Sequence, residues 1–64
     1  MKNKIKELRK TKGLRQEDLA AALGVSRQTI IAIENSKYNP TLELAMKLAR
    51  YLDTTVEELF QLEV

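Results

Sequence analysis

The sequence predicts an all-α fold, a compact bundle of five short helices in one domain spanning residues 1–64. Three observations lead to it. Apolar residues recur at intervals of three and four along most of the chain, which is the spacing of a buried helix face. Only two Gly and one Pro interrupt the 64 residues. Apolar–polar alternation, the mark of a strand, exceeds about four residues only at 60–64, where a short C-terminal strand is the alternative.

Length and composition exclude most enzyme architectures. A chain of 64 residues buries only roughly 60% of its unfolded surface and has no room for a deep cleft. It contains no Cys and no His, so thiolate metal sites, disulfides and the commonest general base are absent. We therefore expect no catalytic residues, no metal, no cofactor and no small-molecule ligand.

The chain also lacks the signals that direct a protein to or through a membrane. Its apolar runs are far shorter than the ~20 residues of a membrane span. The N-terminus is basic, but no apolar core follows it as in a signal peptide. We expect a cytoplasmic protein that does not associate with membranes.

The net charge of +2 is distributed unevenly. Residues 1–37 hold nine Lys or Arg against four acidic residues, a net charge of +5, whereas residues 38–64 hold two against five, a net charge of −3. One face of the fold is therefore expected to be basic, which suits a nucleic-acid partner, although a chance distribution over solvated helix faces is the alternative.

Spacing and stop signals place the first two helices. Ile5 and Leu8 lie on one face of a helix expected over residues 2–12, and Gly13 ends it. The second helix is expected from about residue 16 to residue 23, with apolar residues on one stripe.

Capping residues place the other three helices. Ser26 opens the third, which continues to about residue 35. Residues 36–40 form a loop because the residue before Pro40 avoids the helical region. Thr41 then caps a fourth helix over residues 42–52. Thr55 opens a capping box for a short fifth helix that ends at residue 59 or 60.

Residues 16–35 have the spacing of a helix-turn-helix. Two short helices that cross steeply need a small residue at the crossing, which Ala20 supplies. The sharp turn between the two helices requires a positive φ, which Gly24 adopts without steric cost, and Val25 packs into the turn. Ile30 and Ile33 then return the third helix to the core.

The outer face of this third helix carries side chains that can read DNA. Arg27 can pair bidentately with guanine and Gln28 with adenine, while Ile31 and Ala32 can contact thymine methyl groups. Asn35 lies on the same face. The alternative is that Arg27 and Gln28 are ordinary surface residues and that Ile31 packs sideways into the bundle.

From Ile5 to Phe60 the chain resembles the phage repressor and Cro type of helix-turn-helix domain, also called the XRE family. The resemblance implies a five-helix domain that binds double-stranded DNA and regulates transcription, as a repressor for example, in the form of a homodimer on a near-palindromic operator. The matching signatures are Arg9 before Gly13-Leu14, Gln16-Glu17-Asp18-Leu19-Ala20, Gly24-Val25-Ser26-Arg27, Ile33-Glu34-Asn35 and Asn39-Pro40-Thr41.

The resemblance also implies roles for individual residues. Arg9 and Glu34 would form a structural ion pair between the first and third helices. Gln16, at the start of the second helix, would hold a DNA phosphate, as helix N-termini do. The expected base-reading residues are Arg27, Gln28, Ile31 and Ala32. The expected phosphate contacts are Arg15, Gln16, Thr29, Asn35, Lys37 and Tyr38.

Four positions depart from the family pattern. Arg15 stands where Thr or Ser usually caps the second helix, which removes a cap worth about 1 kcal/mol. Ser36 and Asp53 stand at positions where Gly is frequent, and Asp tolerates the left-handed region better than most residues. Thr54 replaces a usual apolar residue.

Apolar side chains in the second half of the chain exceed what so small a core can hold, which indicates a subunit interface. We expect a symmetric dimer formed by the fourth and fifth helices and residues 56–64, with a short intersubunit β pairing of residues 60–64 as one arrangement. The expected interface residues are Leu44, Tyr51, Phe60, Leu62 and Val64.

Two alternative functions remain open. An antitoxin or controller protein would use the same DNA-binding chemistry and has the same sequence features. A protein-interaction adaptor would use the bundle without DNA. Salt separates the adaptor from a DNA binder, whose log K falls by roughly 0.9 per phosphate neutralised as log salt rises.

Overall fold

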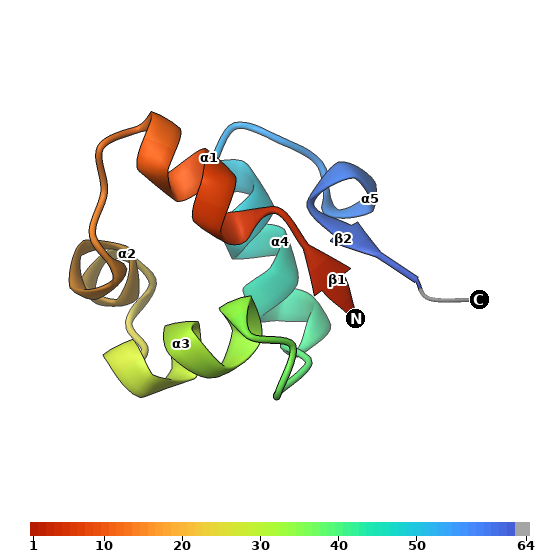
Figure 1. Ribbon diagram of the computed structural model, residues 1–64, viewed down its shortest axis with the longest axis horizontal. Coiled ribbons are helices and arrows are strands. Elements are labelled where there is room, and N and C mark those ends of the chain that lie inside the picture. Colours follow the sequence, from red (N-terminus) through yellow and green to blue (C-terminus); the bar gives the residue numbers. More distant parts are fainter. Residues whose placement is uncertain (63–64) are drawn as a thin grey trace.

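The computed structural model of the protein describes residues 1–62. Over these residues the chain forms five helices and one two-stranded sheet (Figure 1). The elements, in chain order, are β1 (Lys2–Asn3), α1 (Ile5–Thr11), α2 (Gln16–Leu23), α3 (Arg27–Glu34), α4 (Leu42–Tyr51), α5 (Val56–Leu59) and β2 (Phe60–Gln61). The predicted five-helix fold is confirmed, and so is the short C-terminal strand. None of the helices in this part of the chain has the length and apolar character to span a membrane.

One hydrophobic core joins the helices. All five contribute at least one buried side chain to it, so no helix depends on its intrinsic propensity alone. Leu8, Leu14, Leu23 and Val25 pack around the edge of this core. Its fully buried large side chains are Ile5, Leu19, Ile30, Ile33, Leu48 and Leu59.

Three helices begin at the hydroxyl caps that the sequence predicts. The Ser26 hydroxyl accepts the N–H of Thr29 at 3.2 Å, and the Thr41 hydroxyl accepts the N–H of Leu44 at 3.2 Å. The Thr55 hydroxyl likewise accepts an N–H of α5, at 3.1 Å. Each cap satisfies one of the backbone donors left unpaired at a helix start.

Left-handed residues end the helices and set the turns between them. Gly13 and Gly24 have φ values of 70° and 71°, so Gly24 makes the predicted sharp turn between α2 and α3. Ser36 and Asp53 also have positive φ values, 58° and 57°. The family positions where Gly is frequent thus keep the left-handed backbone here, although a side chain makes that backbone costlier.

The two-stranded sheet differs from the prediction at both ends of the chain. Residues 2 and 3, predicted as the start of the first helix, instead pair antiparallel with β2, Lys2 opposite Gln61 and Asn3 opposite Phe60. The predicted helix therefore begins only at Ile5, whose N–H donates to the Asn3 Oδ1 at 3.2 Å. β2 pairs within its own chain, whereas an intersubunit pairing of residues 60–64 was one of the arrangements considered from the sequence.

The N-terminal segment is also tied to the end of α3. The Asn3 Nδ2 donates to the carbonyl oxygen of Ile33 at 2.9 Å, and the Ser36 hydroxyl donates to the carbonyl oxygen of Met1 at 2.9 Å. The Ile33 carbonyl also accepts the backbone N–H of Ser36 at 3.0 Å, so Asn3 adds a second donor at the end of this helix. The sheet and the end of α3 consequently form one connected region.

Candidate nucleic-acid interface

Helices α2 and α3 lie at one end of the molecule, and α5 and the sheet lie at the other end (Figure 1). Ala20 is buried where α2 meets α3, as its small size predicts. Because Ile30 and Ile33 turn inward, the opposite face of α3 is directed away from the core. This geometry produces an outward-facing helix that begins immediately after a tight turn.

The predicted base-reading residues fall into two groups along this face. Arg27 and Gln28, in the first turn of α3, are exposed. Ile31 and Ala32, one turn later, are half-buried. The first turn therefore presents polar side chains to solvent, while the second presents a smaller apolar surface. Ile31 is neither fully exposed nor taken into the core.

The residues predicted to contact phosphates border this face. Arg15, Asn35, Lys37 and Tyr38 are exposed, whereas Gln16 and Thr29 are half-buried. The Thr29 and Ser26 hydroxyls lie 3.0 Å apart, so the Thr29 side chain is held at the start of α3. The α2 and α3 N-termini and the loop after α3 thus surround the exposed helix face with donor groups.

The predicted ion pair between Arg9 and Glu34 is present and shielded from solvent. The Arg9 Nε donates to the Glu34 Oε2 at 2.8 Å, and the Arg9 Nη2 donates to Oε1 at 3.3 Å. The two side chains are only 9% and 4% exposed. The Arg9 Nη1 also donates to the carbonyl oxygen of Leu14 at 2.9 Å. The pair therefore ties α1, the α1–α2 loop and α3 together.

Gln16 connects this ion pair to Arg27, one of the residues predicted to read bases. Its Nε2 donates to the Glu34 Oε1 at 3.2 Å, and its Oε1 accepts from the Arg27 Nη2 at 3.5 Å. A continuous polar chain thus runs from Arg9 through Glu34 and Gln16 to Arg27. From the sequence, only Arg9 and Glu34 were expected to be joined, and no local pattern links positions 16, 27 and 34.

Asp18 provides part of the missing cap at the start of α2. Its Oδ2 accepts the N–H of Arg15 at 2.9 Å and the Arg15 Nε at 3.2 Å. These contacts, first the side-chain bond and then the backbone bond, hold the pKa of Asp18 below its ordinary value. The same contact raises the pKa of Arg15. Arg15 is thus paired with a carboxylate at the position where the sequence predicts a phosphate contact.

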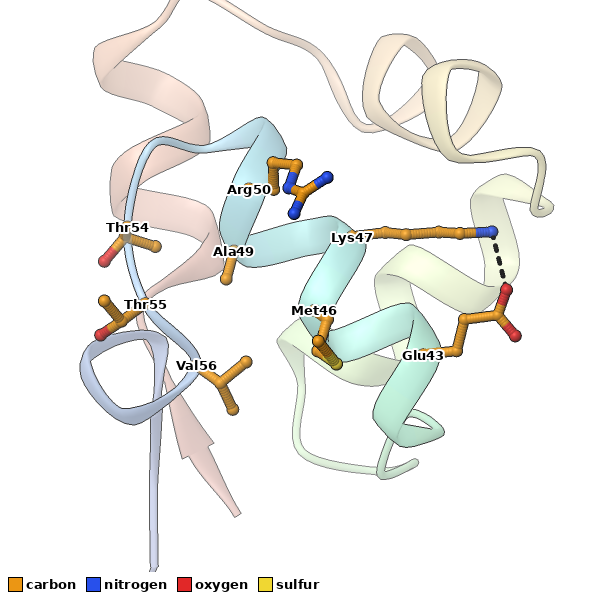
Figure 2. Close-up of a pocket in the computed structure, with 8 residues that line it drawn as sticks. All are labelled: Glu43, Met46, Lys47, Ala49, Arg50, Thr54, Thr55 and Val56. Atoms are coloured by element: carbon orange, nitrogen blue, oxygen red, sulfur yellow. Dashed lines mark ion pairs between the residues drawn. The ribbon is translucent and has the colours of Figure 1, made fainter.

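A second exposed surface lies between α4 and the C-terminal elements. Leu42, Met46 and Leu62 are exposed. Val56 lines two hollows, one together with Met46 and the other together with Leu42 and Leu62. In the hollow of Figure 2, Met46 and Ala49 come from α4 and Val56 comes from the start of α5. We call Leu42, Met46, Val56 and Leu62 the α4–α5 apolar surface.

Of the residues predicted for the dimer interface, Leu62 belongs to this surface. Phe60 is 8% exposed and belongs to the core of a single chain, so it is not a leftover apolar side chain. Leu44 is half-buried against the core. At roughly 100° per residue, Leu44 and Tyr51 project from the flank of α4 opposite Leu42 and Met46. Leu62 lies on the surface, and Val64 lies outside the described residues.

The fold and the exposed start of α3 define a helix-turn-helix DNA-binding domain. The family model described as helix-turn-helix matches residues 5–59, and the chain belongs to this family. It is a transcriptional regulator of the phage repressor and Cro type, which confirms the resemblance. This family is typically non-enzymatic.

Similar proteins come from archaea, bacteria and phages. An uncharacterized HTH-type transcriptional regulator of Methanocaldococcus jannaschii is 57% identical over 60 residues, covering 94% of this chain and 91% of that one. The RstR transcriptional repressor of the cryptic phage CTXphi in Vibrio cholerae is 37% identical over 57 residues, covering 89% of this chain and 51% of RstR. The ImmF control region 10 kDa protein of Bacillus phage phi105 is 35% identical over 60 residues, covering 94% of this chain and 67% of that one.

Proposed function

We propose that the protein binds a near-palindromic operator as a homodimer, with residues 26–35 in the major groove of double-stranded DNA. The observation that carries this proposal is the exposure of Arg27 and Gln28 at the start of an outward-facing α3. Residues in the first turns of a recognition helix are the ones that reach base edges. Arg27 is the candidate reader of guanine, and Gln28 of adenine.

The donors around α3 support a role in binding phosphates. Contacts to phosphates fix the register of a protein on the duplex without reading its sequence. The exposed Lys37 and Asn35 lie just after α3, and Gln16 opens α2, where backbone N–H groups favour an anion. Arg15 would exchange its bond to Asp18 for a phosphate. Thr29 and Tyr38 complete this candidate set.

Selection of bound DNA from a random library tests the proposed reading face. Arg27→Ala and Gln28→Ala should each relax the preference at particular base pairs and cost roughly 1–3 kcal/mol of discrimination. Lys37→Ala serves as the control, because losing a phosphate contact should weaken binding to all duplexes alike. An unchanged preferred sequence in both α3 variants would show that another surface reads the bases.

The α4–α5 apolar surface is the candidate site for the second subunit. Half-sites one turn of DNA apart require recognition helices about 34 Å apart, so each must lie about 17 Å from the dyad. The molecule is 31 Å long, with α2 and α3 toward one end and α5 toward the other (Figure 1). A dyad at the α4–α5 apolar surface is compatible with that spacing. Dimerisation would then use residues 56–62 together with the exposed flank of α4.

Transcription would be controlled by occupancy of the operator. The names of similar phage proteins, such as the RstR transcriptional repressor, favour repression. An antitoxin or controller role uses the same site and is a narrower form of this function. A protein-interaction adaptor is the competing class, and binding that is insensitive to salt would favour it, because phosphate contacts make affinity fall steeply with salt.

A further inference from the structure

The hydrogen bonds that link Arg9 to Arg27 through Glu34 and Gln16 can run in only one donor-to-acceptor order. An arginine only donates hydrogen bonds, and an ionised glutamate only accepts them. Glu34 accepts from Arg9 at 2.8 Å, and any contact that Gln16 makes with it must also be a donation; the Gln16 Nε2 lies 3.2 Å from the Glu34 Oε1. The carboxylate of Glu34 therefore fixes which end of the Gln16 amide faces inward.

The outward end of that amide is the acceptor. With Nε2 committed to Glu34, the Oε1 of Gln16 faces Arg27, whose Nη2 lies 3.5 Å away. This contact occupies one donor of a guanidinium that carries five. The remaining donors can still form the two-pronged contact with guanine.

We propose that Glu34 is a positioning residue for base recognition, which orients Arg27 through the amide of Gln16. This inference rests on the proposed function of α3. Arg27 is exposed and long, so without a partner it must give up many rotamers when it meets a base. A contact already formed before binding reduces that loss and favours the one base whose acceptors match the held geometry.

Exchanging the residues at positions 16 and 34 tests this donor-to-acceptor order. In Glu34→Gln, position 34 no longer demands a donor, and in Gln16→Glu two carboxylates face each other. Each single variant should lose at least about fivefold of the discrimination at the base pair read by Arg27, the lower end of what a bidentate contact supplies. The combined variant Glu34→Gln with Gln16→Glu restores a donor-to-acceptor contact and leaves an acceptor facing Arg27, although it removes the ionic partner of Arg9 and should therefore lower the melting temperature, as both Glu34 variants should. Its discrimination should return to near the wild-type value.

The measured quantity is the ratio of affinities for the selected operator and for one changed at that base pair. A new carboxylate near the DNA phosphates weakens binding to both operators alike, so its effect cancels in this ratio. Ile5→Val is the control for stability, since it trims a fully buried side chain with no polar contact. It should lower the melting temperature and leave the ratio unchanged.

Gln16→Met provides a second, independent test, because it removes both amide contacts and leaves Glu34 bonded to Arg9. It should lower the ratio in the wild-type background and have no further effect after Arg27→Ala. The inference fails if Gln16→Met retains the full ratio, or if the exchanged pair discriminates no better than the single variants. A wild-type protein without any sequence preference would instead overturn the proposed function.

Discussion

Arg9 is a charged side chain that is nevertheless almost fully buried. Such a charge is tolerated only when an opposite charge and further hydrogen bonds replace the lost water. Glu34 provides the charge, and the carbonyl oxygen of Leu14 accepts from the Arg9 Nη1. The residue thus holds three segments together.

Removing the Arg9 side chain should be costly for this reason. Arg9→Met leaves the Glu34 carboxylate shielded without its ionic partner and should lower the free energy of unfolding by about 3 kcal/mol. Urea denaturation measures the change. The matched control is Lys12→Ala, which breaks the more exposed pair between Lys12 and Asp53 and should cost less than about 1 kcal/mol. Equal losses in both variants would contradict the assignment of Arg9–Glu34 as a shielded pair.

The Asp18 carboxylate gives a prediction on pH. Its bonds to Arg15 lower its pKa in the folded protein, so the stabilisation is fully present above the pKa of the unfolded chain. It is lost as the pH falls through the lowered pKa of the folded chain. In Arg15→Ala the bond from the backbone N–H remains but the side-chain bond does not. The Asp18 pKa should therefore rise toward its ordinary value.

Carbon-13 NMR titration of the Asp18 side-chain carboxyl group measures this shift directly. Arg15→Lys is the control, since it keeps a positive charge and removes the guanidinium. It should give a pKa between those of the wild type and Arg15→Ala. A wild-type titration curve in Arg15→Ala would show that the side chain of Arg15 does not hold the carboxylate.

At the scale of elements, helices were predictable wherever local chemistry decides them. The hydroxyl caps at Ser26, Thr41 and Thr55 and the turn at Gly24 follow from short-range rules, and the structure contains all four. The strand β1 was not predictable, because its partner β2 lies nearly sixty residues away in the sequence and a two-residue strand has no pattern of its own.

The glycine turns give a prediction at this scale. A Cβ at Gly24 would meet no atom within 4 Å, so Gly24→Ala changes only the cost of the left-handed backbone. That cost is about 1–2 kcal/mol of folding stability. Gly13→Ala is the matched case, with φ of 70° against 71° and equally open surroundings. Thermal unfolding should show similar losses of stability in both variants. A much larger loss in Gly24→Ala would indicate that the added Cβ makes a contact that this structure does not show.

At the scale of the whole molecule, the two ends perform different tasks in the proposed function. One end carries α2 and α3, and the other carries α5 and β2, which together with α4 contribute the α4–α5 apolar surface (Figure 1). The sequence predicted a surplus of apolar side chains and counted Phe60 among them, whereas Phe60 belongs to the core of the single chain. Phe60 was available to the core because β2 folds back onto β1, a long-range pairing that no count of apolar residues can reveal. The link through Gln16 was missed for the same reason, because it depends on how α2 and α3 pack.

Two exposed residues on α4 test which flank meets the second subunit. Met46 is 55% exposed and belongs to the α4–α5 apolar surface, whereas Tyr51 is 42% exposed on the opposite flank. Met46→Glu should weaken dimerisation at least about tenfold, an effect that corresponds to 1.4 kcal/mol. Sedimentation over a range of concentrations measures it. Tyr51→Glu should leave the dimer intact, and the reverse result would support the interface expected from the sequence.

The pairing of β1 with β2 has a consequence for how the protein matures during synthesis. Residues 2 and 3 leave the ribosome early but must wait for residues 60 and 61 before they gain a strand partner. Asn3, which secures the carbonyl of Ile33 at the end of α3, sits on that waiting strand. During synthesis, the end of α3 therefore gains this contact from a paired strand only after residue 61 has been translated.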